Sequence, residues 1–151
     1  MIGSVLVVCV GNICRSPAGE RALRAGLPGL RVESAGLGAL VGHAADADAA
    51  AAAAACGLSL DGHVARQFTP ALAAGYDLIL VMEPGHRAQI IREAPQLSGR
   101  TLLFDQWCGG QGIADPYRKA PEFHARVIDD ILKAAQTWIA KLDKKRDKAP
   151  R

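Results

Sequence analysis

Hydrophobic and polar positions follow two different periodicities along the chain, and their alternation predicts a series of strands and helices. Short uninterrupted apolar runs are typical of strands buried on both faces, whereas apolar residues that recur every three or four positions indicate amphipathic helices. Strands are expected at residues 4–9, 30–34, 78–82 and 101–104. Helices are expected at about 17–26, at 44–56, from Pro84 onward and in a C-terminal segment that ends at Leu142.

The last of these helices has the clearest pattern. Its apolar residues fall at helical spacing and should cover one face of a sheet: Val127, Ile128, Ile131, Leu132, Ala135, Trp138, Ile139 and Leu142. Trp138 is therefore expected in the core. The Ala-rich segment 44–56 should be helical by intrinsic propensity and end at Gly57.

The order of these elements predicts the fold class. A strand, a helix and a second strand open the chain, and the alternation continues to its end. This arrangement predicts an α/β, doubly wound, flavodoxin-like parallel sheet with helices on both faces, whose ligands lie beyond the carboxyl ends of the strands. Residues 1–142 are expected to form one domain, followed at 143–151 by a disordered basic tail.

Composition and charge narrow the function classes. The chain has 151 residues, half of them apolar, which suffices for one buried core but leaves no room for a second domain. Its net charge is +3, yet residues 141–151 hold six Lys or Arg and two Asp, and the remainder has 12 basic against 13 acidic residues. Because the positive charge is confined to the tail and aromatic residues are few, a nucleic-acid binder is disfavoured.

The chain shows no membrane-spanning pattern. The apolar run at residues 4–8 is too short to cross a bilayer, and no basic segment precedes it. Four cysteines without a secretory signal favour a reducing compartment. A cytoplasmic monomer without membrane insertion is therefore expected.

The most informative motif is a C-x5-R-S loop, Cys9 to Ser16, placed between the first predicted strand and helix. Pro17 at an early helical position and Glu20 in the first turn indicate the helix start. Gly11 and Asn12 tolerate positive φ, so successive N–H groups can point inward as an anion-binding nest. The expected phosphate-binding residues are Val10, Gly11, Asn12, Ile13, Cys14, Arg15 and Ser16.

Cys9 is the candidate nucleophile of this loop. A free thiol is only roughly 3% ionised at pH 7, so catalysis needs surroundings that favour the thiolate. The helix N-terminus, the inward N–H groups and Arg15 act in that direction, and Ser16 can donate a hydrogen bond to the sulfur. Cys9 could instead be a small buried hydrophobe, but the strand-to-helix setting favours the functional interpretation.

The sequence from Val8 to Pro17, together with Asp115-Pro-Tyr117, resembles the low-molecular-weight protein tyrosine phosphatases. The intervening segments 33–36, 62–67 and 76–82 fall in the family's order and spacing. Residues 34–42 and 115–119 resemble bacterial members that are paired with membrane tyrosine kinases of capsule or exopolysaccharide export. The resemblance implies a four-stranded sheet and hydrolysis of phosphotyrosine in a partner protein.

The implied mechanism needs neither metal nor cofactor. The Cys9 thiolate attacks phosphorus, a cysteinyl-phosphate forms, and Asp115 protonates the leaving oxygen and later activates water. Arg15 holds the phosphate oxygens. Asp115 could otherwise be a simple turn residue, since Asp-Pro is a common loop dipeptide.

Several other residues have expected roles at this site. Tyr117 could stack on an aromatic leaving group, or it could equally anchor its loop with the hydroxyl in water. Leu40 stands in the loop where many members of the family carry an aromatic residue. The resemblance implies that Asn12, Ser16, Ser34 and His63 support the loop through hydrogen bonds. Each also has an ordinary structural explanation as a positive-φ residue, a hydroxyl at an element end or a satisfied histidine.

Cys14 lies five positions after Cys9 and could form a reversible disulfide with it, or could simply pack at the helix start. Cys56 and Cys108 are expected to be core or surface thiols. Three other functions remain open. They are an arsenate reductase, which would need closely spaced relay cysteines, a phosphotransfer component, and a phosphotyrosine-binding module without turnover.

Overall fold

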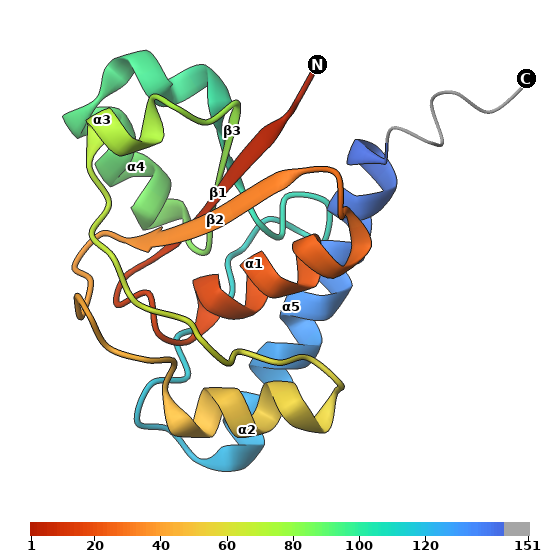
Figure 1. The fold of residues 1–151 in the computed structure, drawn as a ribbon. Helices are drawn as coiled ribbons and strands as arrows, with labels where there is room; N and C mark the ends of the chain where they lie inside the picture. Colours follow the sequence, from red (N-terminus) through yellow and green to blue (C-terminus); the bar gives the residue numbers. More distant parts are fainter. Residues whose placement is uncertain (144–151) are drawn as a thin grey trace, which may run out of the picture.

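Four parallel strands form a single sheet at the centre of the computed structural model, which describes residues 1–143 (Figure 1). The strands are β1 (Ser4–Cys9), β2 (Arg31–Gly36), β3 (Leu78–Val81) and β4 (Thr101–Leu103). They lie in the order β2-β1-β3-β4, and every neighbouring pair is parallel. The predicted four-stranded doubly wound sheet is confirmed. The predicted tail lies, apart from Asp143, outside the described residues.

Helices cover both faces of this sheet. They are α1 (Arg15–Gly26), α2 (Ala47–Ala55), α3 (Pro70–Ala73), α4 (Pro84–Glu93), the 3-10 helix η1 (Pro95–Arg100) and α5 (Pro121–Leu142). Because side chains alternate along a strand, Val5 and Val7 pack into a core with α1 and α5, whereas Leu6 and Val8 pack into a second core with α3, α4 and η1. Figure 1 shows α1 and α5 on one side of the sheet and α3 and α4 on the other.

Element boundaries differ from the predicted ones by a few residues. Helix α1 begins at Arg15 rather than at about residue 17, so the expectation that Glu20 lies in its first turn was wrong. Helix α2 begins later than predicted because Asp46 caps it by accepting a hydrogen bond from the Ala49 N–H at 3.1 Å. The short helices α3 and η1 were not predicted, since four and six residues are too few to show a helical period.

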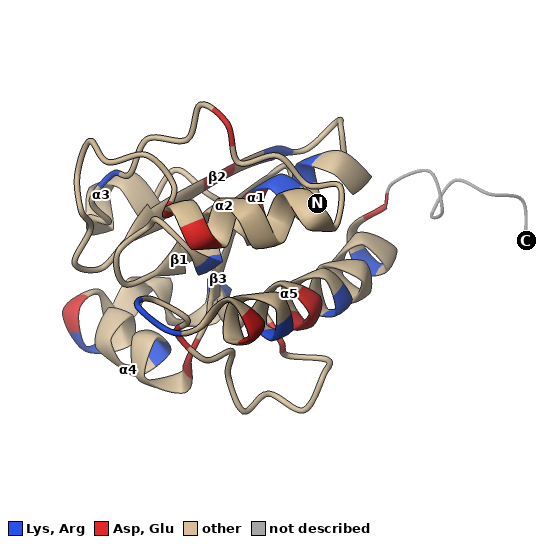
Figure 2. Ribbon diagram, turned by 90° about the horizontal axis from the view of Figure 1, so that it is seen from below, with Lys and Arg blue, Asp and Glu red and all other residues tan. Residues whose placement is uncertain are grey.

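Helix α5 is fixed to the sheet by the residue expected in the core. Trp138 is 4% exposed, and its indole N–H donates to the Phe104 carbonyl at 2.8 Å. Both signs of charge occur along the outer side of α5 (Figure 2). Within residues 1–143, each helix is too short or too polar to cross a membrane.

Candidate functional site

The loop between β1 and α1 forms a cup because its carbonyl groups are turned outward. The carbonyl oxygens of residues 9–13 accept hydrogen bonds, in that order, from Leu37 N (2.9 Å), Gly38 N (3.0 Å), Leu40 N (3.1 Å), His63 Nε2 (2.5 Å) and Asp46 N (2.9 Å). In a planar trans peptide the N–H points opposite to the preceding carbonyl, so the N–H groups of residues 10–14 face the interior of the loop. The predicted anion-binding nest therefore has its structural basis in the residues that surround the loop.

A chain of hydrogen bonds leads to the Cys9 sulfur. The Cys9 Sγ lies 2.9 Å from the Ser16 Oγ, and the Asn12 Nδ2 donates to that same Oγ at 2.8 Å. Because the Ser16 hydroxyl accepts from Asn12, its own proton is free to point at the sulfur. This contact is compatible with the predicted stabilisation of a Cys9 thiolate by Ser16, which stays a prediction.

The chain continues from Asn12 into the protein. Its Nδ2 also donates to the Ser34 Oγ at 3.0 Å, and Ser34 donates to a carboxylate oxygen of Glu20 at 3.0 Å. The Asn12 Oδ1 accepts the Arg66 N–H at 3.0 Å, so every polar group of this buried amide has a partner. Asn12 has φ of 58°, a left-handed conformation that asparagine tolerates better than most residues.

His63 closes the network on the backbone side. Because the Asn12 carbonyl can only accept, the His63 Nε2 is the donor in their hydrogen bond. Burial lowers the pKa of His63, and the hydrogen bond to the Asn12 carbonyl acts in the opposite direction. The structure thus brings Asn12, Ser16, Ser34 and His63 together and adds Glu20, whose supporting role the sequence reasoning missed.

Arg15 is held in the wall of the cup by two acceptors. Its side chain is 1% exposed, and its Nη1 donates to the Glu83 Oε2 at 2.7 Å and to the Ile113 carbonyl at 2.8 Å. The Nη2 lies 3.7 Å from the Asp115 Oδ2. A guanidinium fixed on one edge keeps its other edge oriented for a tetrahedral oxyanion.

Glu83 and His86 are functional candidates that the sequence analysis did not identify. The Glu83 Oε2 lies 3.3 Å from the His86 Nε2 as well as beside Arg15. Burial and the positive charge of Arg15 lower the pKa of His86. The position of Glu83 in the sequence could have indicated its place at the site. Cys9 ends β1 and Glu83 closely follows β3, and these neighbouring parallel strands end at the same edge of the sheet.

One cavity brings the predicted catalytic and cleft residues together. It is lined by Cys9, Val10, Gly11, Ile13, Cys14, Arg15, Gly38, Leu40, Asp115 and Tyr117. The Asp115 Oδ1 accepts the Tyr117 N–H at 3.0 Å, which fixes the turn after the acid. Leu40 and Tyr117 are each 37% exposed at the mouth of the cavity. The arrangement can bind a tetrahedral anion at its floor and an apolar ring at its mouth.

Cys14 lines the same cavity without sharing the environment of Cys9. It packs with Ile13, Ala49 and Ala65, and burial followed by the negative charge of Asp46 raises its pKa well above the usual range. Cys9 and Cys14 are both free thiols, so a disulfide between them stays a prediction. Cys56 and Cys108 are exposed thiols.

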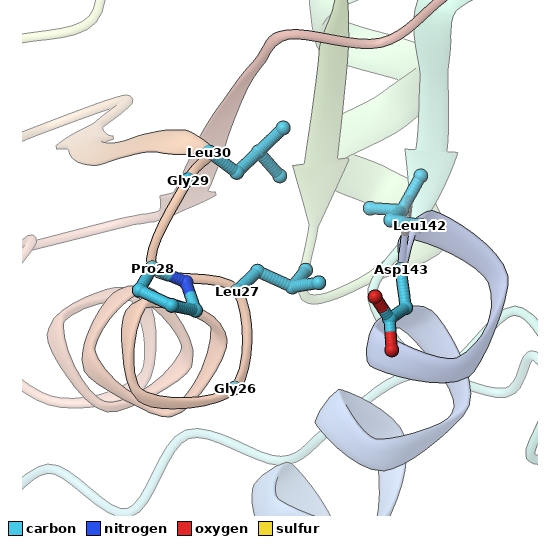
Figure 3. A pocket seen from close by; sticks show the side chains of 7 residues that line it. All are labelled: Gly26, Leu27, Pro28, Gly29, Leu30, Leu142 and Asp143. Atoms are coloured by element: carbon cyan, nitrogen blue, oxygen red, sulfur yellow. The ribbon is translucent and has the colours of Figure 1, made fainter. Parts of the chain in front are cut away.

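A second cavity lies between the ends of α1 and α5, where the side chains of Leu27, Leu30 and Leu142 approach one another (Figure 3). It is bordered also by Asp143. Its lining includes none of the residues predicted to bind phosphate or to act in catalysis.

Comparisons with known proteins agree with this geometry. Residues 4–148 match the family described as low molecular weight phosphotyrosine protein phosphatase. The chain is 50% identical over 141 residues to the low molecular weight protein-tyrosine-phosphatase Etp of Escherichia coli K12, covering 93% of this chain and 95% of Etp. Two solved structures are also similar. The tyrosine phosphatase Wzb of Escherichia coli K30 in complex with sulphate has a TM-score of 0.92 and 49% identity over 94% of this chain and 99% of Wzb. Vibrio vulnificus Wzb in complex with benzylphosphonate has a TM-score of 0.91 and 45% identity over 94% of this chain and all of that one (100%).

Proposed function

Because the chain belongs to the low molecular weight phosphotyrosine protein phosphatase family and is a protein-tyrosine-phosphatase, we propose that Cys9 is its nucleophile and Asp115 its general acid and base. The observation that carries this assignment is the shared cavity. In it the Cys9 sulfur, the inward N–H groups of the loop, the Arg15 guanidinium and the Asp115 carboxyl group meet.

The first chemical step transfers the phosphoryl group to sulfur. The Cys9 thiolate attacks phosphorus in line with the leaving oxygen, an S–P bond forms, and the P–O bond to the tyrosine oxygen breaks. Asp115 gives its proton to that oxygen, so phenol leaves rather than phenolate. Arg15 and the loop N–H groups bind the three remaining phosphoryl oxygens throughout.

The second step releases phosphate. The Asp115 carboxylate accepts a proton from a water molecule, whose oxygen attacks phosphorus while the S–P bond breaks. The sulfur leaves as a thiolate, which the Ser16 hydroxyl stabilises across their 2.9 Å contact. Inorganic phosphate then departs, and Asp115 has recovered its proton.

The depth of the cavity supports a preference for phosphotyrosine over phosphoserine. Cys9 is 2% exposed, so a phosphate must enter the cavity to meet it. The ring of phosphotyrosine is long enough to place its phosphate at the floor while resting between Leu40 and Tyr117 at the mouth. The benzylphosphonate bound by the Vibrio vulnificus relative combines the same kind of ring with a tetrahedral group.

The partner protein that we propose is a membrane tyrosine kinase of capsule or exopolysaccharide export, reached from the cytoplasm by a monomeric phosphatase. The similarity of residues 34–42 and 115–119 to bacterial members paired with such kinases supports this partner. Faster turnover on the phosphorylated tail of such a kinase than on an unrelated phosphotyrosine peptide is the expected result. Equal turnover on both would contradict this choice of partner.

The mechanism is tested by hydrolysis of matched phosphotyrosine and phosphoserine peptides in excess chelator. We expect wild type to cleave only phosphotyrosine, Cys9→Ser to be inactive, and Asp115→Asn to lose about 10²-fold or more in kcat. Asp61→Asn, which neutralises an exposed aspartate outside the cavity lining, should keep the wild-type rate. Activity in Cys9→Ser, or binding of the peptide by wild type without cleavage, would overturn the proposal.

A further inference from the structure

Three side chains that commonly bind metals converge where α2 and α5 begin. Asp46 caps α2, Asp48 lies in its first turn, and His124 is the fourth residue of α5. A ring nitrogen of His124 and a carboxylate oxygen from each aspartate all lie within 4.8 Å of one another. None of the three residues lines the catalytic cavity.

His124 is the observation that turns this cluster into a candidate site. Its ring is 1% exposed, and neither ring nitrogen has a hydrogen-bond partner among the described residues. A polar group that is buried without a partner destabilises a protein, so such groups nearly always meet a ligand, a water molecule or an ion. Here one of these nitrogens lies close to two carboxylates, which is the donor set of a cation site.

We propose that Asp46, Asp48 and His124 bind a divalent transition-metal ion, with Zn²⁺ as the best match. One imidazole nitrogen and two carboxylate oxygens give three protein ligands, and a water molecule can complete a tetrahedral set. Ligands of a tetrahedral Zn²⁺ lie about 3.4 Å apart, so donors at the upper separation of 4.8 Å need to close by about 1.4 Å. The exposed Asp48 side chain is free to make this movement.

The Asp46 ligand is compatible with its present role in the fold. Its Oδ2 accepts the Ala49 N–H, and carboxylate oxygens have enough lone pairs to bind a metal at the same time. The Asp46 N–H also donates, at 2.9 Å, to the Ile13 carbonyl of the loop from Cys9 to Ser16, the phosphate loop. Helix α5 begins six positions after Asp115, so a bound ion would join the support of the phosphate loop to the segment that carries the acid.

The test is titration of the full chain with Co²⁺, followed by competition with Zn²⁺. Co²⁺ bound to thiolate shows a sulfur-to-metal charge-transfer band, which separates this site from the thiols of Cys9, Cys14, Cys56 and Cys108. We expect one Co²⁺ bound without that band, displacement by Zn²⁺, and a rise in Tm on binding.

Three substitutions identify the ligands. Asp46→Asn keeps the helix cap, Asp48→Asn changes an exposed residue, and His124→Gln removes the buried donor. Each should weaken Co²⁺ binding by more than about tenfold, because even partners outside the first coordination shell contribute that much. Asp61→Asn serves as the control and should bind Co²⁺ as wild type does.

Three results would overturn the site. The first is binding that shows only the thiolate band, and the second is affinity unchanged in both Asp46→Asn and Asp48→Asn. These two variants decide the question even if His124→Gln fails to fold, since one keeps the cap and the other is at the surface. Absence of any Co²⁺ or Zn²⁺ binding to wild type would likewise contradict the proposal.

Discussion

Asn12 meets two requirements of the phosphate loop, one with its backbone and one with its side chain. Its backbone takes a left-handed conformation, while its amide donates to Ser16 and Ser34 and accepts from the Arg66 N–H. A glycine would meet the first requirement only, and an alanine would meet neither. The reactive sulfur is therefore oriented indirectly, through a residue that need not touch the phosphate with its side chain.

Replacing Asn12 by Ala should reduce both stability and turnover. We expect the free energy of unfolding to fall by about 2–4 kcal/mol, because buried partners lose their hydrogen bonds, and kcat to fall about 10²-fold as the loop shifts. Urea denaturation and steady-state kinetics measure the two effects. Asn12→Gly keeps the positive φ and isolates the side chain's share, so full activity in Asn12→Gly would refute the role given to the amide.

At the scale of elements, the end of β2 buttresses the phosphate loop. Gly36 is the last residue of β2, and a Cβ at this position would overlap the Val10 carbonyl oxygen and lie 3.0 Å from the Asn12 nitrogen. Both are backbone atoms of the loop, which cannot move without changing the cup. The close approach of β2 to the loop thus depends on a residue without a side chain.

Gly36→Ala should therefore displace the backbone of the phosphate loop, although Gly36 itself does not line the cavity. We expect weaker inhibition by inorganic phosphate and a fall in kcat of about tenfold or more, since the loop backbone is displaced. Gly29→Ala is the matched control, because a Cβ there has no neighbour within 4 Å, and its stability should stay within about 0.5 kcal/mol of wild type. If the two variants have equal activity, the buttress has no catalytic importance.

The same scale explains which elements could be predicted from the sequence. Strands β1, β3 and β4 were found because each contains a short apolar run, and β2 was found where apolar and polar residues alternate from Leu30 to Glu33. Helix α5 was found because its apolar residues keep a helical period over 22 residues. Helix α3 begins with a Thr69 cap and Pro70, and η1 begins with Pro95 and has no side-chain cap. Both are too short for an apolar period, so no periodic pattern predicted them. The start of α1 was misplaced because the loop leads directly into the helix at Arg15.

For the site, the sequence pointed to the candidate reactive residues and to the candidate supporting residues Asn12, Ser16, Ser34 and His63. It missed the two acceptors that hold Arg15, which are Glu83 and the Ile113 carbonyl. Cys9, Arg15 and Asp115 stand in recognisable motifs. Glu83 does not, because its role depends on β3 lying beside β1. The contact of Arg15 with Ile113 involves only the backbone carbonyl of Ile113. Any residue could supply that carbonyl, so the amino-acid type at this position does not predict the contact.

At the scale of the whole molecule, two buried histidines make stability depend on pH. The pKa values of His63 and His86 both lie below the ordinary value of 6.5, chiefly because burial disfavours the charged ring. As the pH falls below 6.5, both histidines take up protons in the unfolded chain at a higher pH than in the folded chain. Their contribution to stability is therefore complete above that pH and is lost as the pH falls toward the folded-state pKa values.

We expect the free energy of unfolding to decrease between about pH 7.5 and about pH 5.5, measured by urea denaturation. His63→Gln should make this decrease smaller, because it removes one of the two groups. The same change at the exposed His43 should leave the slope as in wild type. A slope that His63→Gln does not alter would show that His63 has no part in this pH dependence.

The hydrogen bond from Arg15 to the Ile113 carbonyl spans 98 positions of the chain. During synthesis Cys9, the proposed nucleophile, leaves the ribosome well before the carbonyl that fixes Arg15 and before Asp115 just after it. A nascent chain that ends before Ile113 already carries the reactive cysteine but has neither the carbonyl that fixes Arg15 nor the proton donor. The order of the sequence thus delays the proposed activity until the chain has been made through Asp115, and chains that end before Ile113 should carry the Cys9 thiol without phosphatase activity.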